Sequence, residues 1–195
     1  MRGWIVREPM SETDWYEVVH GAELRQGDLL VDCPVFTLSV DVGYPLPLDY
    51  EPMIRAESYD LVIMTQSCDL DNDKVEEVLL APIAAWSETV RAGADRNPAL
   101  RSREFRRGLI AGNIPGLSLL HKRDESPSLP WSVVTFHRLF ALPKVFLHRF
   151  AEASGPRLRL IPPYREHLAQ ALARYFMRVG LPHDAKAFEQ EGKGD

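Results

Sequence analysis

The chain has 195 residues, of which 45% are hydrophobic and 26% charged, a balance typical of a folded globular protein rather than a disordered one. It has no long uncharged apolar run, which excludes a transmembrane helix, and its N-terminus becomes acidic too soon for a signal peptide. Two cysteines are too few for a disulfide framework or a four-cysteine zinc site. We therefore expect one soluble domain in the cytoplasm, with no association with a membrane.

The net charge of −5 hides an uneven distribution along the chain. Residues 1–90 carry 18 acids and 5 bases, whereas residues 91–178 carry 6 acids and 16 bases. Two interpretations remain open: ion pairs between the halves, within one chain or head to tail between chains, or a basic face that binds nucleic acid. The acidic overall balance favours the pairing of the halves, because nucleic-acid-binding domains are usually strongly basic.

The N-terminal part predicts two short elements, a strand at 4–7 and a helical turn that runs from 11 to 19. A first long strand is expected at 24–35, beginning at the turn Gln26-Gly27-Asp28. Residues 37–58 are rich in proline, tyrosine and acids, and they predict a long loop over the mouth of the sheet.

Residues 60–66 form a continuous apolar run, which predicts a central strand buried on both faces. Residues 75–83 predict its hairpin partner after an acidic turn. The second half predicts a basic helix at 99–110, strands at 117–121, 131–136 and 157–161, and a short helix at 144–151.

The C-terminal helix is the best-defined helix in the sequence. It is expected at 163–180, opened by Pro162-Pro163, with apolar side chains at helical spacing on one face: Leu168, Leu172, Phe176 and Val179. Residues 184–195 predict a disordered tail.

These elements predict a mainly β domain, of the α+β class, spanning residues 1–183. Its parts are an SH3-like small β-barrel, an inserted helical segment and a packed C-terminal helix. The boundaries are 24–84 and 117–161 for the barrel core, 86–112 for the insertion and 163–180 for the helix.

Four segments carry a resemblance to a known family: Gly-Asp-Leu-Leu-Val-Asp at 27–32, Leu-Val-Ile-Met at 61–64, Ala-Pro-Ile at 81–83 and Ser-Val-Val at 132–134. Their order resembles the MazF/PemK-type toxins, which are SH3-like barrels that cleave RNA. The family's catalytic arginine would fall at Ser58-Tyr59 and its catalytic threonine at Ala84. The resemblance therefore implies the fold without the toxin's catalytic residues, and fold alone does not imply function.

The segment Thr-Gln-Ser-Cys-Asp-Leu at 65–70 is the densest in reactive side chains. Gln66, Cys68 and Asp69 are candidates for a polar ligand site. A catalytic thiolate is the alternative, but a neighbouring carboxylate raises a thiol's pKa, so a structural cysteine is favoured over catalysis. Arg55 is the basic residue nearest to the position of the toxin family's catalytic arginine, and with Cys68 and Asp69 it completes the candidate catalytic set.

The basic segment offers Arg103 and Arg107 as binding residues, but Phe105 is its only obvious stacking aromatic. We expect no metal and no cofactor. The acidic turn at 69–73 lacks the glycine and the glutamate of a calcium loop. A site built from Cys33 and Cys68 with His121 or His137 is a minor alternative.

We predict that the long loop, the Cys68 turn and the basic segment converge on one mouth of the barrel. The function this favours is a non-catalytic binding or accessory module of a bacterial multi-protein system, toxin–antitoxin-like or phage-defence-like. A protein partner is expected, with nucleic acid and a second copy of the chain as further options. The alternative is an RNA endonuclease of the MazF/PemK type with relocated catalytic residues.

Overall fold

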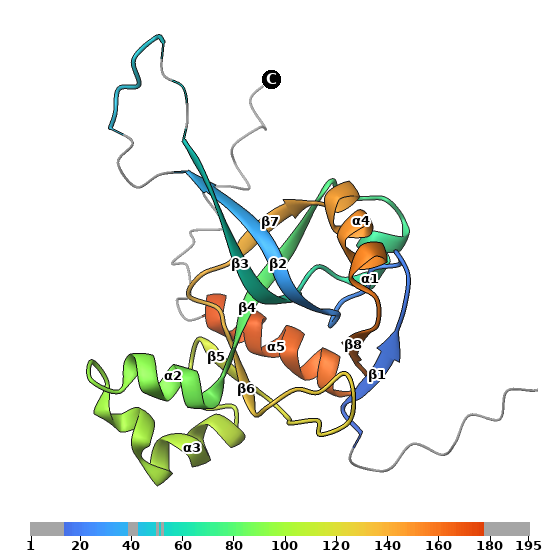
Figure 1. Cartoon of the computed structure of the whole chain (residues 1–195). Coiled ribbons are helices and arrows are strands. Elements are labelled where there is room, and N and C mark those ends of the chain that lie inside the picture. The colour runs from blue at the N-terminus through green and yellow to red at the C-terminus, as the bar shows by residue number, and fades with distance from the viewer. Residues whose placement is uncertain (1–13, 39–42, 50, 52, 178–195) are drawn as a thin grey trace, which may run out of the picture.

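The computed structural model describes residues 14–38, 43–49, 51 and 53–177, which form an α+β fold of antiparallel strands with five α-helices (Figure 1). The strands are β1 (Tyr16–Val19), β2 (Leu29–Leu38), β3 (Ile54–Ile63), β4 (Glu77–Ala85), β5 (Leu117–Leu120), β6 (Ser132–Thr135), β7 (Phe140–Pro143) and β8 (Arg157–Leu160). The helices are α1 (Ser67–Asp71), α2 (Trp86–Gly93), α3 (Arg103–Ile110), α4 (Lys144–Ser154) and α5 (Tyr164–Phe176), with a 3-10 turn, η1, at Pro98–Arg101.

The larger sheet has six strands in the order β2-β3-β4-β6-β5, and β7 pairs with the first half of β4. All four strands expected at 24–35, 60–66, 75–83 and 132–136 are confirmed as members of this one sheet. The segment expected to be central lies between two partners, because β3 pairs with both β2 and β4. Its strand ends at Ile63, three residues earlier than expected.

Both faces of β3 are buried at its C-terminal end, Leu61–Ile63, as the continuous apolar run predicts. Leu61 and Ile63 belong to a core under α4, whereas Val62 and Met64 belong to a second core on the opposite face. Leu168 of α5 packs in that second core. The two faces of the sheet are therefore covered by different helices.

A two-stranded sheet, β1-β8, joins the larger sheet through Gly27 and Asp28. The Gly27 amide donates a hydrogen bond to the Ile63 carbonyl, and the Gly27 carbonyl accepts one from the Leu160 amide, both at 2.9 Å. Gly27 has a φ of +87°, and a Cβ there would lie 2.9 Å from the Leu160 Cβ. Glycine is required at this position because the backbone is left-handed and the neighbouring strand is too close for a side chain.

Asp28 anchors the junction with a buried ion network. Arg157 Nε lies 2.9 Å from Asp28 Oδ2, and the Arg159 guanidinium pairs with both carboxylate oxygens. The three residues are only 0%, 5% and 8% exposed, respectively. Both guanidinium groups also donate hydrogen bonds to the carbonyls of Gly21 or Glu23, and Arg159 Nη1 lies 4.0 Å from the Glu17 carboxylate. The acidic and basic halves of the sequence are therefore paired in part, and here the pairing is buried.

Several expectations need correction. The sheet order runs from β2 to β5 without those strands pairing, so no barrel is closed within the described residues. Residues 16–19 form a strand instead of a helical turn because they pair with β8, about 140 residues away in sequence. Phe176, expected in the core, is 63% exposed. The strand at 4–7, Val179 and the tail at 184–195 lie outside the described residues.

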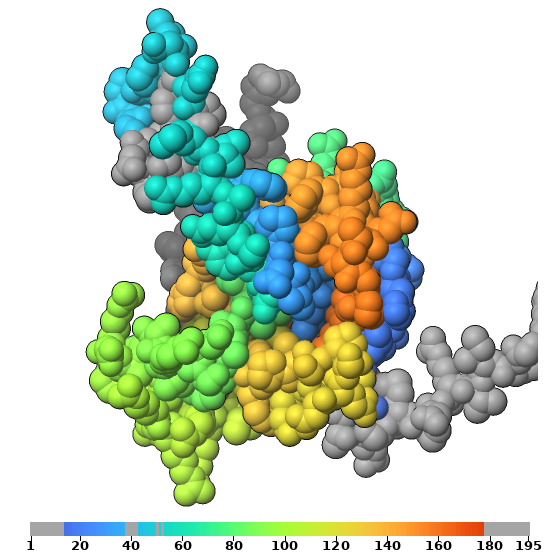
Figure 2. Space-filling model, in the orientation of Figure 1, coloured from blue at the N-terminus to red at the C-terminus, as the bar shows by residue number. Residues whose placement is uncertain are grey.

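The segment expected as a loop over the sheet is instead the end of a long hairpin. β2 and β3 remain paired out to Leu38 and Ile54, and the hairpin projects away from the body (Figures 1 and 2). The strands diverge from the sheet because β3 pairs with β4 only from Asp60 onward. We call the described residues 43–49, 51 and 53–57 the arm.

None of the described helices is both long enough and apolar enough to cross a membrane.

Candidate binding groove

The inserted segment folds into α2, η1 and α3, where the sequence predicts one basic helix. Ser102 interrupts that helix: its backbone is extended, and its hydroxyl accepts a hydrogen bond from the Phe105 amide at 3.0 Å. Such a side-chain cap fixes the start of α3. Asn97 caps η1 in the same way, with Pro98 at its first position.

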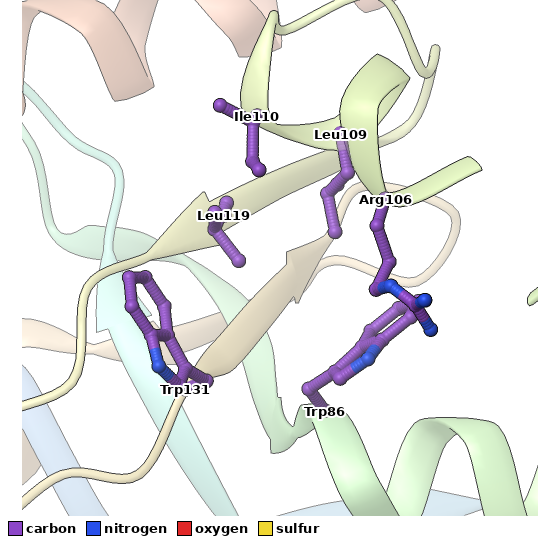
Figure 3. Close-up of a pocket in the computed structure, with 6 residues that line it drawn as sticks. All are labelled: Trp86, Arg106, Leu109, Ile110, Leu119 and Trp131. Atoms are coloured by element: carbon purple, nitrogen blue, oxygen red, sulfur yellow. The ribbon is translucent and has the colours of Figure 1, made fainter. Parts of the chain in front are cut away.

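A groove lies between α3, β5 and α5. Its main cavity has a volume of about 520 Å³, and an adjoining cavity of about 220 Å³ shares four of its lining residues. The shared residues are Leu109, Ile110, Leu119 and Trp131 (Figure 3). Ile110 is 72% exposed and Trp131 is 41% exposed, so the groove presents large apolar side chains to solvent. Exposed apolar surface in a concave site is typical of a binding surface.

Aromatic rings line the groove from end to end. At the α2 end, Trp86 stacks on Phe105 with ring centroids 6.1 Å apart. Trp131 meets His121 edge to face at 4.4 Å, and Trp15 stacks on Tyr164 at 4.1 Å. Sequence reasoning missed these partners because Trp15, Trp86, Trp131 and Tyr164 lie in four separate segments. Their membership of one surface follows from the sheet order and is not visible in the sequence.

The rim of the groove is basic. The Arg106 guanidinium lies beside the Trp86 ring (Figure 3), and Arg174 and His167 project from α5 along the main cavity. Arg103, Arg106 and Arg107 make no ion pair with the described residues. The ion pairs found in the insertion, Arg91–Glu88 and Arg101–Asp95, are internal to it, each at 3.9 Å.

The favoured pairing of the two halves therefore occurs within the described residues, but not through Arg103, Arg106 or Arg107 of the insertion. The bases that pair with the acidic half come from later elements, as in the pairs Lys144–Asp73 and Arg138–Glu57. The insertion keeps its positive charge available to a partner.

Gln66, Cys68 and Asp69 lie together at α1. The Cys68 sulfur lies 3.6 Å from Gln66 Oε1 and 3.8 Å from Asp69 Oδ1, and the thiol is exposed. The adjacent hydroxyl, that of Ser67, accepts a hydrogen bond from the Gln26 amide. The short helix in place of the expected turn thus presents three polar side chains to solvent.

The predicted convergence of sites on one mouth does not occur. Lys144 holds α1 at the start of β4, through hydrogen bonds to the carbonyls of Leu70 and Glu76, whereas α2 begins directly after β4 ends. Nine strand residues separate the two ends by about 25–30 Å. Figure 1 shows α1 and α3 at opposite ends of the molecule. Arg103 and Arg107 lie on α3, the helix that also carries the groove-lining Arg106, but neither lines a cavity itself. Gln66, Cys68 and Asp69 lie at the other end of β4.

Arg55 also stays apart from Cys68 and Asp69. It lies at the arm end of β3, opposite Thr37, while α1 follows the other end of that strand. The eight residue steps from Arg55 to Ile63 span about 26 Å in an extended strand. The three residues proposed for a relocated ribonuclease site are not assembled in this fold.

Cys33 has a different environment from Cys68. It is fully buried in the core beneath α4, and burial raises the pKa of its thiol to about 11. Within the described ranges, no group of three His, Cys, Asp or Glu side chains is placed to hold a metal ion. The minor alternative of a site shared by Cys33, Cys68 and a histidine is thus not supported.

These environments predict unequal thiol reactivity. We expect one thiol to react with a soluble disulfide reagent in the native protein at neutral pH, and two after unfolding in urea. Burial and the raised pKa both disfavour the reactive thiolate of Cys33. A colorimetric thiol titration measures this, and Cys68→Ser should abolish the native signal. Retention of that signal in Cys68→Ser would contradict the assignment.

Comparison with models of known protein families and with curated proteins finds no match for this chain.

Proposed function

We propose that this chain is a non-catalytic binding module, and that the groove between α3, β5 and α5 receives an extended, acidic and partly apolar segment of a protein partner. The observation that carries the proposal is the combination of an apolar floor, exposed tryptophan and unpaired arginine in one concave surface. Tryptophan and arginine are the residues most enriched where binding energy concentrates in protein interfaces.

The proposal fits an accessory role in a bacterial multi-protein system, of the toxin–antitoxin or phage-defence kind. A distant relation to the MazF/PemK fold remains part of the proposal, and it rests on the order of the four sequence motifs alone. Loss of the toxin chemistry fits the positions of Ser58 and Ala84. The candidate replacement Arg55 lies too far from Cys68 and Asp69 for the three to act together.

A display library of random peptides, selected on the full chain, tests the proposal. We expect the selected peptides to combine acidic residues with leucine, proline or aromatic residues. We expect Trp131→Ala with Arg106→Glu to weaken their binding about tenfold or more in fluorescence anisotropy, as loss of a central contact does. Arg149→Glu is the matched control, because Arg149 is exposed on α4, away from the groove. Selection of basic peptides, or binding unaffected by the groove variant, would reject the proposal.

Single-stranded nucleic acid is the second candidate ligand. It is favoured by the unpaired Arg103, Arg106 and Arg107 next to the stacked Trp86–Phe105 pair, since such grooves combine phosphate contacts with stacking. The same anisotropy assay with a labelled single-stranded RNA decides between the two. Binding that weakens steeply with salt and is lost in the groove variant would favour nucleic acid. We expect no cleavage of that RNA.

A further inference from the structure

The arm presents large apolar side chains to solvent at the far end of the molecule. Tyr44, Leu46 and Met53 are 96%, 50% and 68% exposed, and Leu48 is fully exposed. Apolar side chains gathered on a projecting hairpin are unfavourable in water and mark a contact surface. Pro45 and Pro47 alternate with the two leucines, which restricts the backbone and lowers the entropy lost on binding.

The arm and the inserted segment have opposite charge. The arm carries three acids and one base, a net charge of −2, whereas residues 86–112 carry six bases and three acids, a net charge of +3. In the arm, Asp49 and Glu51 make no ion pair with the described residues. The same is true of Arg103, Arg106 and Arg107 in the inserted segment. Complementary charge of this kind steers association and fixes its register.

The arm also has the chemistry of the segment that the groove is proposed to receive. Its leucines and prolines suit a floor of Leu109 and Leu119 beside Trp131, since aromatic-lined grooves are used to recognise proline-rich segments. The arm points away from the inserted helices of its own chain, with the two at opposite ends of the view in Figure 2. A contact between arm and groove therefore requires two molecules.

We propose that the arm of one copy docks in the groove of a second copy, head to tail. This inference rests on the proposed binding role of the groove and names its occupant. The contact is heterologous, because one copy contributes its arm and the other its groove. The resulting pair still has one unoccupied arm and one unoccupied groove. Self-association therefore grows with concentration to species larger than a dimer, unless a ring closes, and the charge contribution weakens with salt.

Complementation between two full-length variants tests the inference. The groove variant carries Trp131→Ala and Arg106→Glu, and the arm variant carries Leu46→Ser and Leu48→Ser. Sedimentation velocity measures association, and circular dichroism confirms that each variant is folded. We expect the wild type to associate as its concentration rises, each variant alone to be monomeric, and an equimolar mixture to form a 1:1 dimer. In this mixture the intact arm of the groove variant meets the intact groove of the arm variant.

The other outcomes overturn the head-to-tail contact. Association by the groove variant alone would indicate arm-to-arm contact, and association by the arm variant alone would indicate groove-to-groove contact. A monomeric mixture, or a wild type that is monomeric at every concentration, would reject arm docking altogether. The peptide selection tests the proposed function separately. If the wild type is monomeric but its groove binds the selected acidic peptides, the proposed function stands and only the docking of the arm is rejected. Arg149→Glu should associate as the wild type does.

Discussion

Replacement of Asp28 by asparagine should cost about 3–5 kcal/mol of unfolding free energy. The substitution keeps the shape of the side chain and removes its charge, leaving two guanidinium groups buried at the junction of the sheets. A buried charge without its partner is strongly destabilising, because the group cannot recover its hydration. Urea denaturation followed by circular dichroism measures the loss.

An ion pair whose carboxylate is exposed provides the control for this prediction. Asp73→Asn removes the carboxylate that pairs with Lys144 at the surface, and solvent screening should leave only a small effect. A triple variant, Asp28→Leu with Arg157→Met and Arg159→Leu, should regain much of the stability lost by Asp28→Asn, since well-packed apolar residues often replace buried ion networks without loss. A loss in Asp28→Asn no greater than that in Asp73→Asn would show that the network is not what holds the junction.

The second large effect is expected on α5, as a graded series along its apolar face. Leu168→Ala should cost about 2–5 kcal/mol, because Leu168 is buried in the core on the α5 side of the sheet. Leu172 is only partly buried, so Leu172→Ala should cost about 1–2 kcal/mol, less than full burial implies. Phe176→Ala should change stability by no more than about 0.5 kcal/mol.

Thermal and urea unfolding of the three variants measure the series. The order matters more than the absolute values, since the cost of a cavity depends on how far its surroundings relax. Equal losses of unfolding free energy in Leu168→Ala and Phe176→Ala would contradict the unequal burial of these two side chains in α5.

The sequence by itself determined the parts of this fold whose signal is local. The apolar run at 60–66 predicted a strand buried on both faces, and Pro162-Pro163 with the periodic leucines predicted α5. The Gly27-Asp28 turn was recognisable as the start of a strand. In each case the residues involved are close in sequence, and the length of the apolar run, its period and the flanking turn residues distinguish strand from helix.

The tertiary structure decided everything that depends on distant pairing. Residues 16–19 suit a helical turn by local preference, yet pairing with β8 makes them a strand. The partners of Asp28 lie about 130 residues away, so its burial could not be read from its neighbours. The groove is the clearest case, since Trp15, Trp86, Trp131 and Tyr164 lie in segments that only the sheet order brings together. The sequence of the basic segment shows one stacking aromatic, whereas in the fold aromatic residues from other segments line the same surface. The reason is that topology, and not spacing along the chain, decides which side chains are neighbours across strands and helices.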